Sequence, residues 1–162
     1  MSMKKESMIT KKATGKPRKI MGPVDFLIVR FPGNKFSGLI APELKTLEKN
    51  GLIRVIDLVF VLKDKGGKIR ITEAKNLGGV EGDAFSAFAQ SVNEWLSDED
   101  IKVFAESLPN NCSGAILLYE NTWAIPFKKA LMKTGAELVD QGRIPPELIQ
   151  KVEQDLMTAG EG

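Results

Sequence analysis

The chain has 162 residues, with 23 Lys or Arg, 21 Asp or Glu, one Cys and no His. Without His there is no imidazole base for a Ser-His-Asp or Cys-His site, and the usual His/Cys sites for zinc, copper or haem are excluded. One Cys cannot form an internal disulfide or a CxxC redox pair. With 43% hydrophobic and 27% charged residues, the composition is that of a soluble globular protein.

The first 22 residues differ in charge from the rest. They hold seven basic residues and one acidic residue, a net charge of +6, whereas the remainder carries −4. Because they lack apolar periodicity, we predict a disordered basic tail over residues 1–22 and a single domain over residues 23–159. Translation from Met21 instead of Met1 would remove the tail. The basic side chains that could contact phosphates of nucleic acid or of an anionic membrane are Lys11, Lys12, Lys16, Arg18 and Lys19.

The chain contains no apolar run of the ~18 residues needed to span a bilayer. The basic N-terminus also lacks the apolar core of a signal peptide. The absence of disulfides fits a reducing compartment. We therefore expect a cytoplasmic protein that is not transmembrane.

The first half of the chain alternates strand and helix patterns. Runs of β-branched and aromatic residues end at Gly, Pro and Asn, and Gly51 follows an amphipathic segment as a C-terminal cap. Asp64-Lys65-Gly66-Gly67 is typical of a hairpin turn. The predicted elements are strands over 24–31, 52–62 and 68–72 and a helix over 37–50.

The sequence of the second half of the chain predicts mainly helices. Asp83 and Ser97 are suited to cap helices, and Pro145-Pro146 is suited to start one. The predicted elements are helices over 83–96, 98–108 and 123–133, strands over 114–119 and within 136–144, and a final helix from 146.

The element order predicts an α+β fold, a ferredoxin-like βαββαβ sandwich with a C-terminal αβα extension. The strand over 52–62 is apolar on both faces, so both faces must be covered. A simple ferredoxin-like sandwich covers only one face of its sheet. We expect the extension to cover part of the second face, and a partner protein or a second copy to cover the rest.

Asp57 is the most informative candidate residue, because an Asp within an apolar strand is costly unless it is paired or solvated. It is either a buried acid or ligand-binding carboxylate, or a structural group that pairs with Arg54 or Arg30 or lies at a bulge. Asp25 is a second strand carboxylate.

Two strand-to-helix junctions supply further candidates. Asn34, Lys35 and Phe36 lie in a glycine-containing loop that could present backbone N–H groups and a Lys to an anion. The loop lacks the glycine spacing of a P-loop or of a dinucleotide-binding motif. The alternative is that it is an ordinary strand-to-helix turn that binds no ligand. Glu120, Asn121 and Trp123 could line a pocket, or else cap a helix and fill the core. Cys112 either has no functional role or is a redox sensor.

These segments resemble a family of small prokaryotic α/β proteins classed as a domain of unknown function, over about residues 22–155. The motifs that carry the resemblance are Gly22-Pro23-Val24-Asp25, Phe31-Pro32-Gly33-Asn34-Lys35-Phe36, residues 53–61, Lys63-Asp64, Glu120-Asn121-Thr122-Trp123-Ala124 and Arg143-Ile144-Pro145. The resemblance implies a cytosolic protein with no assigned activity or cofactor, some of whose relatives are linked with stress responses or membrane association. The long basic tail departs from the family pattern.

We expect a non-enzymatic accessory or regulatory protein that binds a larger protein complex or forms a homodimer, and that has a link to stress. We predict no catalytic residues, no metal and no cofactor. The alternatives are a small-molecule or anion-binding sensor, a ribosome- or nucleic-acid-associated stress factor that uses the tail, and an enzyme that works through carboxylates alone.

Overall fold

A computed structural model describes residues 20–35, 39–73 and 95–161. Within these ranges the fold is α+β, with four strands and four helices. Residues 1–19 of the predicted tail lie outside the described residues, whereas residues 20–22 lie within them and Gly22 is buried. The elements in chain order are β1 Val24–Pro32, α1 Ile40–Lys49, β2 Arg54–Lys63, β3 Ile69–Glu73, α3 Asp98–Ser107, β4 Cys112–Glu120, α4 Ala124–Lys133 and α5 Pro146–Gly160. All eight were predicted, with boundaries that differ by up to three residues. The predicted helix over 83–96 lies outside the described residues except for Trp95 and Leu96, which are not helical.

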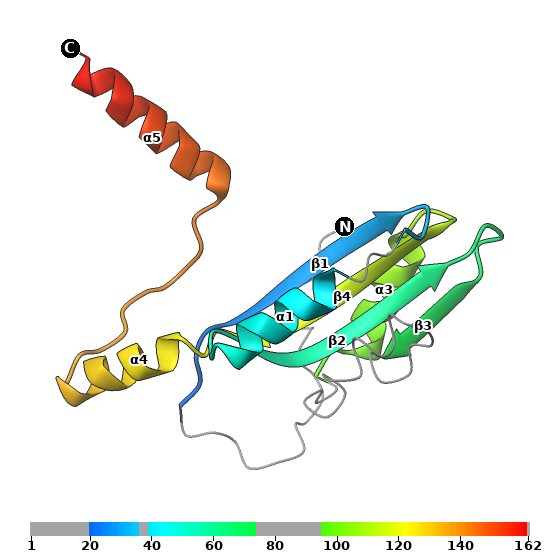
Figure 1. Cartoon of the computed structure of the whole chain (residues 1–162), viewed down its shortest axis with the longest axis horizontal. Helices are drawn as coiled ribbons and strands as arrows, with labels where there is room; N and C mark the ends of the chain where they lie inside the picture. The colour runs from blue at the N-terminus through cyan, green and yellow to red at the C-terminus, as the bar shows by residue number, and fades with distance from the viewer. Residues whose placement is uncertain (1–19, 36–38, 74–94, 162) are drawn as a thin grey trace. The chain divides into compact units, whose positions relative to one another are not determined.

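The four strands form one antiparallel sheet in the order β1-β4-β2-β3 (Figure 1). β4 pairs with β1 on one side and with β2 on the other. β1 and β2 therefore run parallel to each other with β4 between them. The ferredoxin-like arrangement is not confirmed, because in that fold β1 and β3 are the two central strands.

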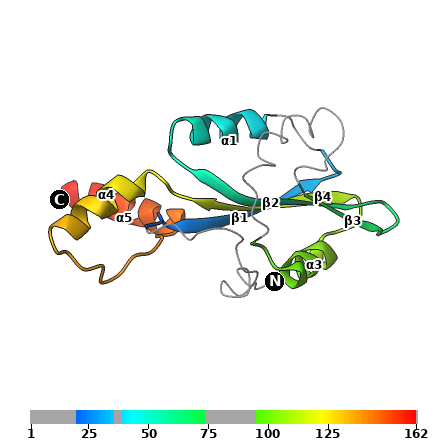
Figure 2. The ribbon, with the colours of Figure 1, turned by 90° about the horizontal axis from the view of Figure 1, so that it is seen from below.

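The helices cover opposite faces of the sheet, as Figure 2 shows with α1 on one side and α3 on the other. On the α1 face, Ala41 and Leu44 pack against β2 and β4 residues such as Leu58. On the α3 face, Ile101 and Phe104 pack against a second set. The expectation that the C-terminal extension and a partner cover the second face was wrong, because each crossover places its own helix on a different face.

Two local features explain how α3 begins and how closely it packs. Ser97 is its N-cap, and its hydroxyl accepts from the backbone N–H of Asp100 at 3.2 Å while donating to that residue's carboxylate at 2.7 Å. At Gly114 of β4 a Cβ would overlap the ring of Phe104. Glycine at this position lets α3 approach the sheet.

The chain divides into two compact units between Lys129 and Ala130, where the sequence predicted a single domain over 23–159. The predicted strand within 136–144 is absent: residues 136–145 are irregular, and Val139 is 95% exposed. A strand needs a neighbouring backbone to pair with, and short apolar runs such as Leu138-Val139 do not form one alone. Among the described residues no helix is long and apolar enough to cross a membrane.

Candidate functional site

The predicted site residues lie at two opposite ends of the sheet. Val24 of β1 pairs with Glu120 of β4, whereas Pro32 pairs with Cys112. Eight steps of a strand span about 27 Å. The loop that carries Asn34 and Lys35 is therefore far from Glu120, Asn121 and Trp123. One pocket cannot contain both groups.

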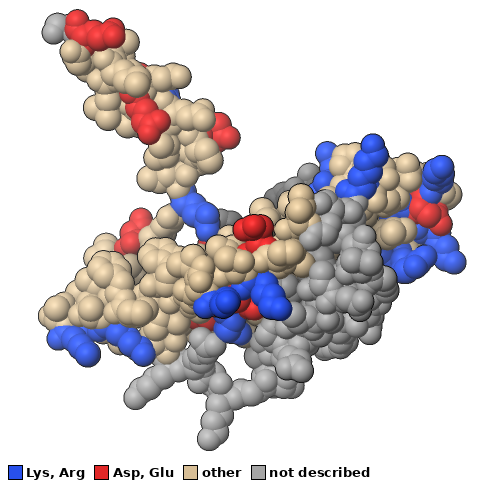
Figure 3. Space-filling model, in the orientation of Figure 1, with Lys and Arg blue, Asp and Glu red and all other residues tan. Residues whose placement is uncertain are grey.

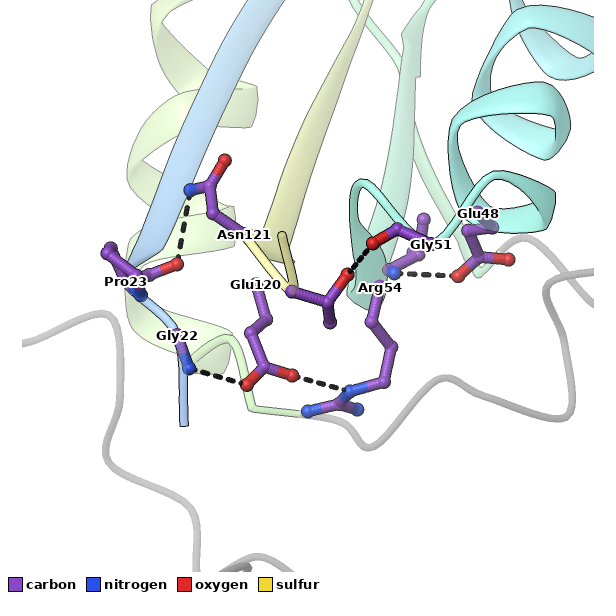
Figure 4. A network of polar contacts seen from close by, with 9 residues as sticks. Gly22, Pro23, Glu48, Gly51, Arg54, Glu120 and Asn121 are labelled. Carbon is purple, nitrogen blue, oxygen red and sulfur yellow. Dashed lines mark hydrogen bonds and ion pairs between the residues drawn. The ribbon is translucent and has the colours of Figure 1, made fainter. Parts of the chain in front are cut away.

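Glu120 is the centre of a buried polar network at the first of these ends (Figure 4). Its side chain is 0% exposed, and its Oε1 accepts from the Nε of Arg54 at 2.9 Å. Its Oε2 accepts from the backbone N–H of Gly22 at 2.9 Å. Both carboxylate oxygens are thus engaged, and they join the start of β2 and the segment before β1 to the end of β4.

Asn121, the residue directly after β4, extends this network to β1. Its backbone N–H and its Nδ2 donate to the carbonyl oxygen of Pro23 at 2.7 and 3.1 Å, and Nδ2 also donates to the carboxylate of Asp25 at 2.6 Å. A Cβ on Gly22 would overlap the carbonyl oxygen of Asn121. We call Gly22, Asp25, Arg54, Glu120 and Asn121 the polar clamp.

The two residues after Asn121 anchor the start of α4. The hydroxyl of Thr122 donates to the carbonyl oxygen of Gly51 at 2.9 Å, and the backbone N–H of Trp123 donates to that of Leu52 at 3.3 Å. Trp123 remains 57% exposed, and its Nε1 donates to Asn121 Oδ1 at 3.3 Å. The clamp and these anchors therefore set where α4 leaves the sheet and keep an aromatic side chain at the surface.

Asp57 lies on a β-bulge of β2, where the register with β4 shifts between Val55 and Asp57. It is 2% exposed, so the bulge does not bring it to solvent. Its Oδ1 accepts from the backbone N–H of Leu58 at 2.8 Å and its Oδ2 from that of Leu96 at 2.9 Å. Asp57 therefore holds the segment that leads into α3. The Arg54 proposed for it bonds instead to Glu120, its register partner on β4.

The loop after β1 is fixed by a turn. Asn34 has a positive φ, and its backbone N–H donates to the carbonyl oxygen of Phe31 at 3.2 Å. Its Nδ2 donates to Oδ1 of Asn111, a second residue with positive φ, at 3.2 Å. Lys35 is exposed, and the predicted candidate Phe36 lies outside the described residues.

Cys112 is 3% exposed at the start of β4, so its thiol is shielded from solvent. Within the ranges that the structure describes, the acidic and Cys side chains form no group of three or more that could hold a metal ion.

An apolar cavity of about 290 Å³ lies between α1 and the sheet. Its walls are side chains of α1 and of three strands, and none of them is charged. The lining residues are Leu27, Val29, Phe31, Ile40, Leu44, Leu58, Phe60, Ala115 and Leu117. Sequence reasoning missed it, because the alternation of apolar residues shows which face is buried but not how completely one helix fills it.

The C-terminal helices carry apolar side chains that remain exposed. On and before α4 the exposed set is Trp123 57%, Phe127 64%, Leu131 41% and Met132 56%. On α5 it is Leu148 50%, Ile149 43%, Val152 46%, Leu156 68% and Met157 71%. No residue of α5 is buried. The sequence predicted both helices, and one of its two alternatives for Trp123 was a place in the core, whereas the Trp123 side chain is exposed.

Comparisons with curated proteins and with solved structures give no match. A family model matches residues 20–160, which span the sheet, the polar clamp and both C-terminal helices. This confirms the resemblance to a domain of unknown function. The chain belongs to the Family of unknown function (DUF6325).

Proposed function

We propose that the protein is a non-enzymatic accessory or regulatory protein, and that it works by binding another protein through the apolar faces of α4 and α5. The observation that carries this proposal is the exposed apolar stripe of α5, a 15-residue helix with no buried residue. Isolated helices of this length are marginal in water, and their stability in proteins comes from packing an apolar face. Contact with another surface would therefore both order α5 and bury its stripe.

The polar clamp supports the same assignment. Its most buried carboxylate, Glu120, has both oxygens bonded within the protein and no exposed surface from which to reach a substrate. The clamp instead fixes the start of α4, where Trp123 and Phe127 are presented to solvent. Trp is enriched among the residues that dominate protein–protein binding energy.

The test is capture of partners by the tagged full chain. Val152→Asp places a charge in the middle of the α5 stripe, and we expect it to remove every stoichiometric partner from the captured fraction. The matched control is Val139→Asp, which makes the same change at a side chain 95% exposed outside both helices. Equal capture by both variants, measured by quantitative mass spectrometry, would refute the proposal.

A second candidate function is binding of an apolar small molecule, favoured by the cavity beside α1. Its volume of about 290 Å³ is close to the lower end of ligand sites, and its walls suit an apolar ligand and not an anion. A thermal-shift screen of fatty acids and other apolar ligands tests it. Ala115→Ile, at a buried lining position, narrows the cavity, so it should abolish any shift that binding there produces.

A further inference from the structure

We infer that two copies of this chain join their sheets edge to edge, through antiparallel pairing of β1 with β1 of the second copy. In the order β1-β4-β2-β3, β1 and β3 are the two edge strands of the described sheet (Figure 1). An edge strand presents backbone N–H and C=O groups that can pair with another chain. The inference goes beyond the proposed function, because it concerns the sheet and not α4 or α5.

The two edges of the sheet differ in length, charge and burial. β3 has five residues, and the side chains of Lys68 and Arg70 at this edge are exposed. Figure 3 shows Lys and Arg gathered at the end of the sheet that carries the β2–β3 hairpin. Short length and charge are features that protect natural sheet edges. β1 has nine residues, none of them buried, and Phe26 and Leu27 are 38% and 50% exposed. β1 is therefore the edge that is suited to pairing.

The backbone groups of alternate β1 residues point away from β4. The backbone N–H of Asn121 donates to the carbonyl oxygen of Pro23 at 2.7 Å, so these two residues form a hydrogen-bonded pair of the β1–β4 ladder. Such pairs recur at every second residue of an antiparallel ladder, and the β1–β4 register contains no shift. Odd-numbered residues of β1 therefore bond to β4. The residues whose N–H and C=O groups face outward are Val24, Phe26, Ile28 and Arg30.

A two-fold axis at Leu27 gives a β1–β1 register with apolar pairs at its centre. Leu27 then lies opposite Leu27 of the second copy, and Phe26 lies opposite Ile28. Aromatic and β-branched side chains that face each other stabilise antiparallel strands. Because successive side chains point to opposite faces of a sheet, the exposed Phe26 and Leu27 are covered on both faces. The interface is self-complementary, as a closed symmetric dimer requires.

The neighbouring registers fit less well. A shift of two residues keeps the outward backbone groups paired, but it places Phe26 opposite Arg30 in one direction and Leu27 opposite Asp25 in the other. The register centred on Leu27 pairs residues 24–30. It ends before Pro32, which has no N–H to donate.

A second copy fits this edge better than a segment of the same chain does. The longest irregular segment among the described residues includes 136–145, and it stays irregular with Val139 95% exposed although β1 belongs to the same chain. Pairing of β1 with β3 of another copy would be head-to-tail, and such contacts form open assemblies unless they close into a ring. Pairing of β1 with β1 matches two strands of equal length and closes at two copies.

Disulfide trapping in the full chain tests the predicted register. Residues directly opposite each other in a non-hydrogen-bonded pair have Cα atoms about 4.5 Å apart, a separation that a disulfide can bridge. Two Leu27→Cys thiols should therefore form an intermolecular disulfide, with oxidised glutathione taking up the two electrons and two protons. The matched control is Ile71→Cys, because Ile71 is 49% exposed on the other edge strand, and Cys112 is shielded at 3% exposure. Equal yields of covalent dimer from the two variants on a non-reducing gel would overturn the inference.

Leu27→Lys tests the same contact without a new covalent bond. Wild type should show a concentration-dependent monomer–dimer equilibrium by sedimentation velocity. The variant places two Lys side chains opposite each other, which should raise the dimer dissociation constant on the order of 100-fold. Ile71→Lys should leave the constant unchanged, and far-UV circular dichroism shows that both variants are folded. A wild-type protein that is monomeric at all concentrations would contradict the inference.

Hydrogen exchange distinguishes a second copy from a segment of the same chain. The N–H groups of Phe26 and Ile28 face outward, so their protection in the wild type should increase with protein concentration. Protection that is strong and independent of concentration would mean that β1 pairs within one chain, and the inference would then be wrong.

The outcomes separate this inference from the proposed function. Val152→Asp on α5 should leave the β1 dimer unchanged, so loss of self-association in that variant would assign the dimer to the C-terminal helices and overturn the inference. A monomeric wild type that loses a captured partner on Val152→Asp would refute the dimer and leave the proposed function standing.

Discussion

Replacing Glu120 by Gln tests whether the polar clamp holds the end of the sheet together. The carboxylate accepts from Arg54 through Oε1 and from Gly22 through Oε2, both at 2.9 Å, with no exposed surface. A carboxamide has one acceptor oxygen, so its NH₂ group must face one of these two donors. That donor loses its partner in a site that water does not reach.

The expected loss follows from those two contacts. A hydrogen bond to a charged group contributes about 1.5–3 kcal/mol, and a buried unsatisfied donor costs a similar amount. We therefore expect Glu120→Gln to lower the free energy of unfolding by about 2–3 kcal/mol, with a fall in Tm of roughly 10 °C.

Urea unfolding followed by far-UV circular dichroism measures this change. Glu106→Gln, the same substitution at an exposed position of α3, should stay within about 0.5 kcal/mol of wild type. A Glu120→Gln protein that is as stable as this control would refute the conclusion that the polar clamp holds this end of the sheet together. The double variant Arg54→Met/Glu120→Gln should lose less than the two single losses added together, because the side chains contact each other.

Three further changes have distinct expected outcomes. Gly22→Ala should lower Tm by at least several degrees, because the added Cβ overlaps a backbone carbonyl oxygen; Gly142→Ala, with no atom near its added Cβ, should leave Tm unchanged. Asp57→Ala should cost about 3 kcal/mol in urea unfolding, because two buried backbone N–H groups lose their acceptor; a loss under about 1 kcal/mol would show that they find other acceptors. Ser97→Ala should cost about 1 kcal/mol through loss of the α3 N-cap, and Ser97→Thr, which keeps a hydroxyl that can both accept from and donate to Asp100, should recover most of it.

Local sequence patterns were sufficient to predict the elements of the sheet unit. Asp64-Lys65-Gly66-Gly67 gave the β2–β3 hairpin, and Ser97 gave the start of α3, because turns and caps depend on neighbouring residues alone. The strand order could not be predicted in the same way, since it depends on which strand enters between β1 and β2. The two-sided apolar pattern of β2 correctly indicated two covered faces, but it does not say which helix covers each.

The candidate site residues also divide into features with a local sequence signal, which could be predicted, and contacts between distant residues, which could not. Asp57 was correctly identified as exceptional within an apolar strand, yet its acceptor role depends on Leu96, which is 39 residues away. The Arg54–Glu120 pair depends on strand register over 66 residues and has no local signal. The α5 helix was predicted, but the 3.6-residue spacing of its apolar side chains is the same for a helix that packs in a core and for one that packs on a partner.

The position of β4 has a consequence for how the chain folds during synthesis. β1 and β2 are both made before β4 and do not pair with each other, so the β2–β3 hairpin is the one strand pair of the described sheet that can form early. Every contact of β1 in the sheet joins residues about ninety positions apart, and such long-range pairing slows folding. We therefore expect β1 and the apolar surface of β2 to stay exposed on the nascent chain until Cys112–Glu120 emerges. Chaperone dependence in vivo should then concentrate in that interval, and release should coincide with insertion of β4 between its two neighbours.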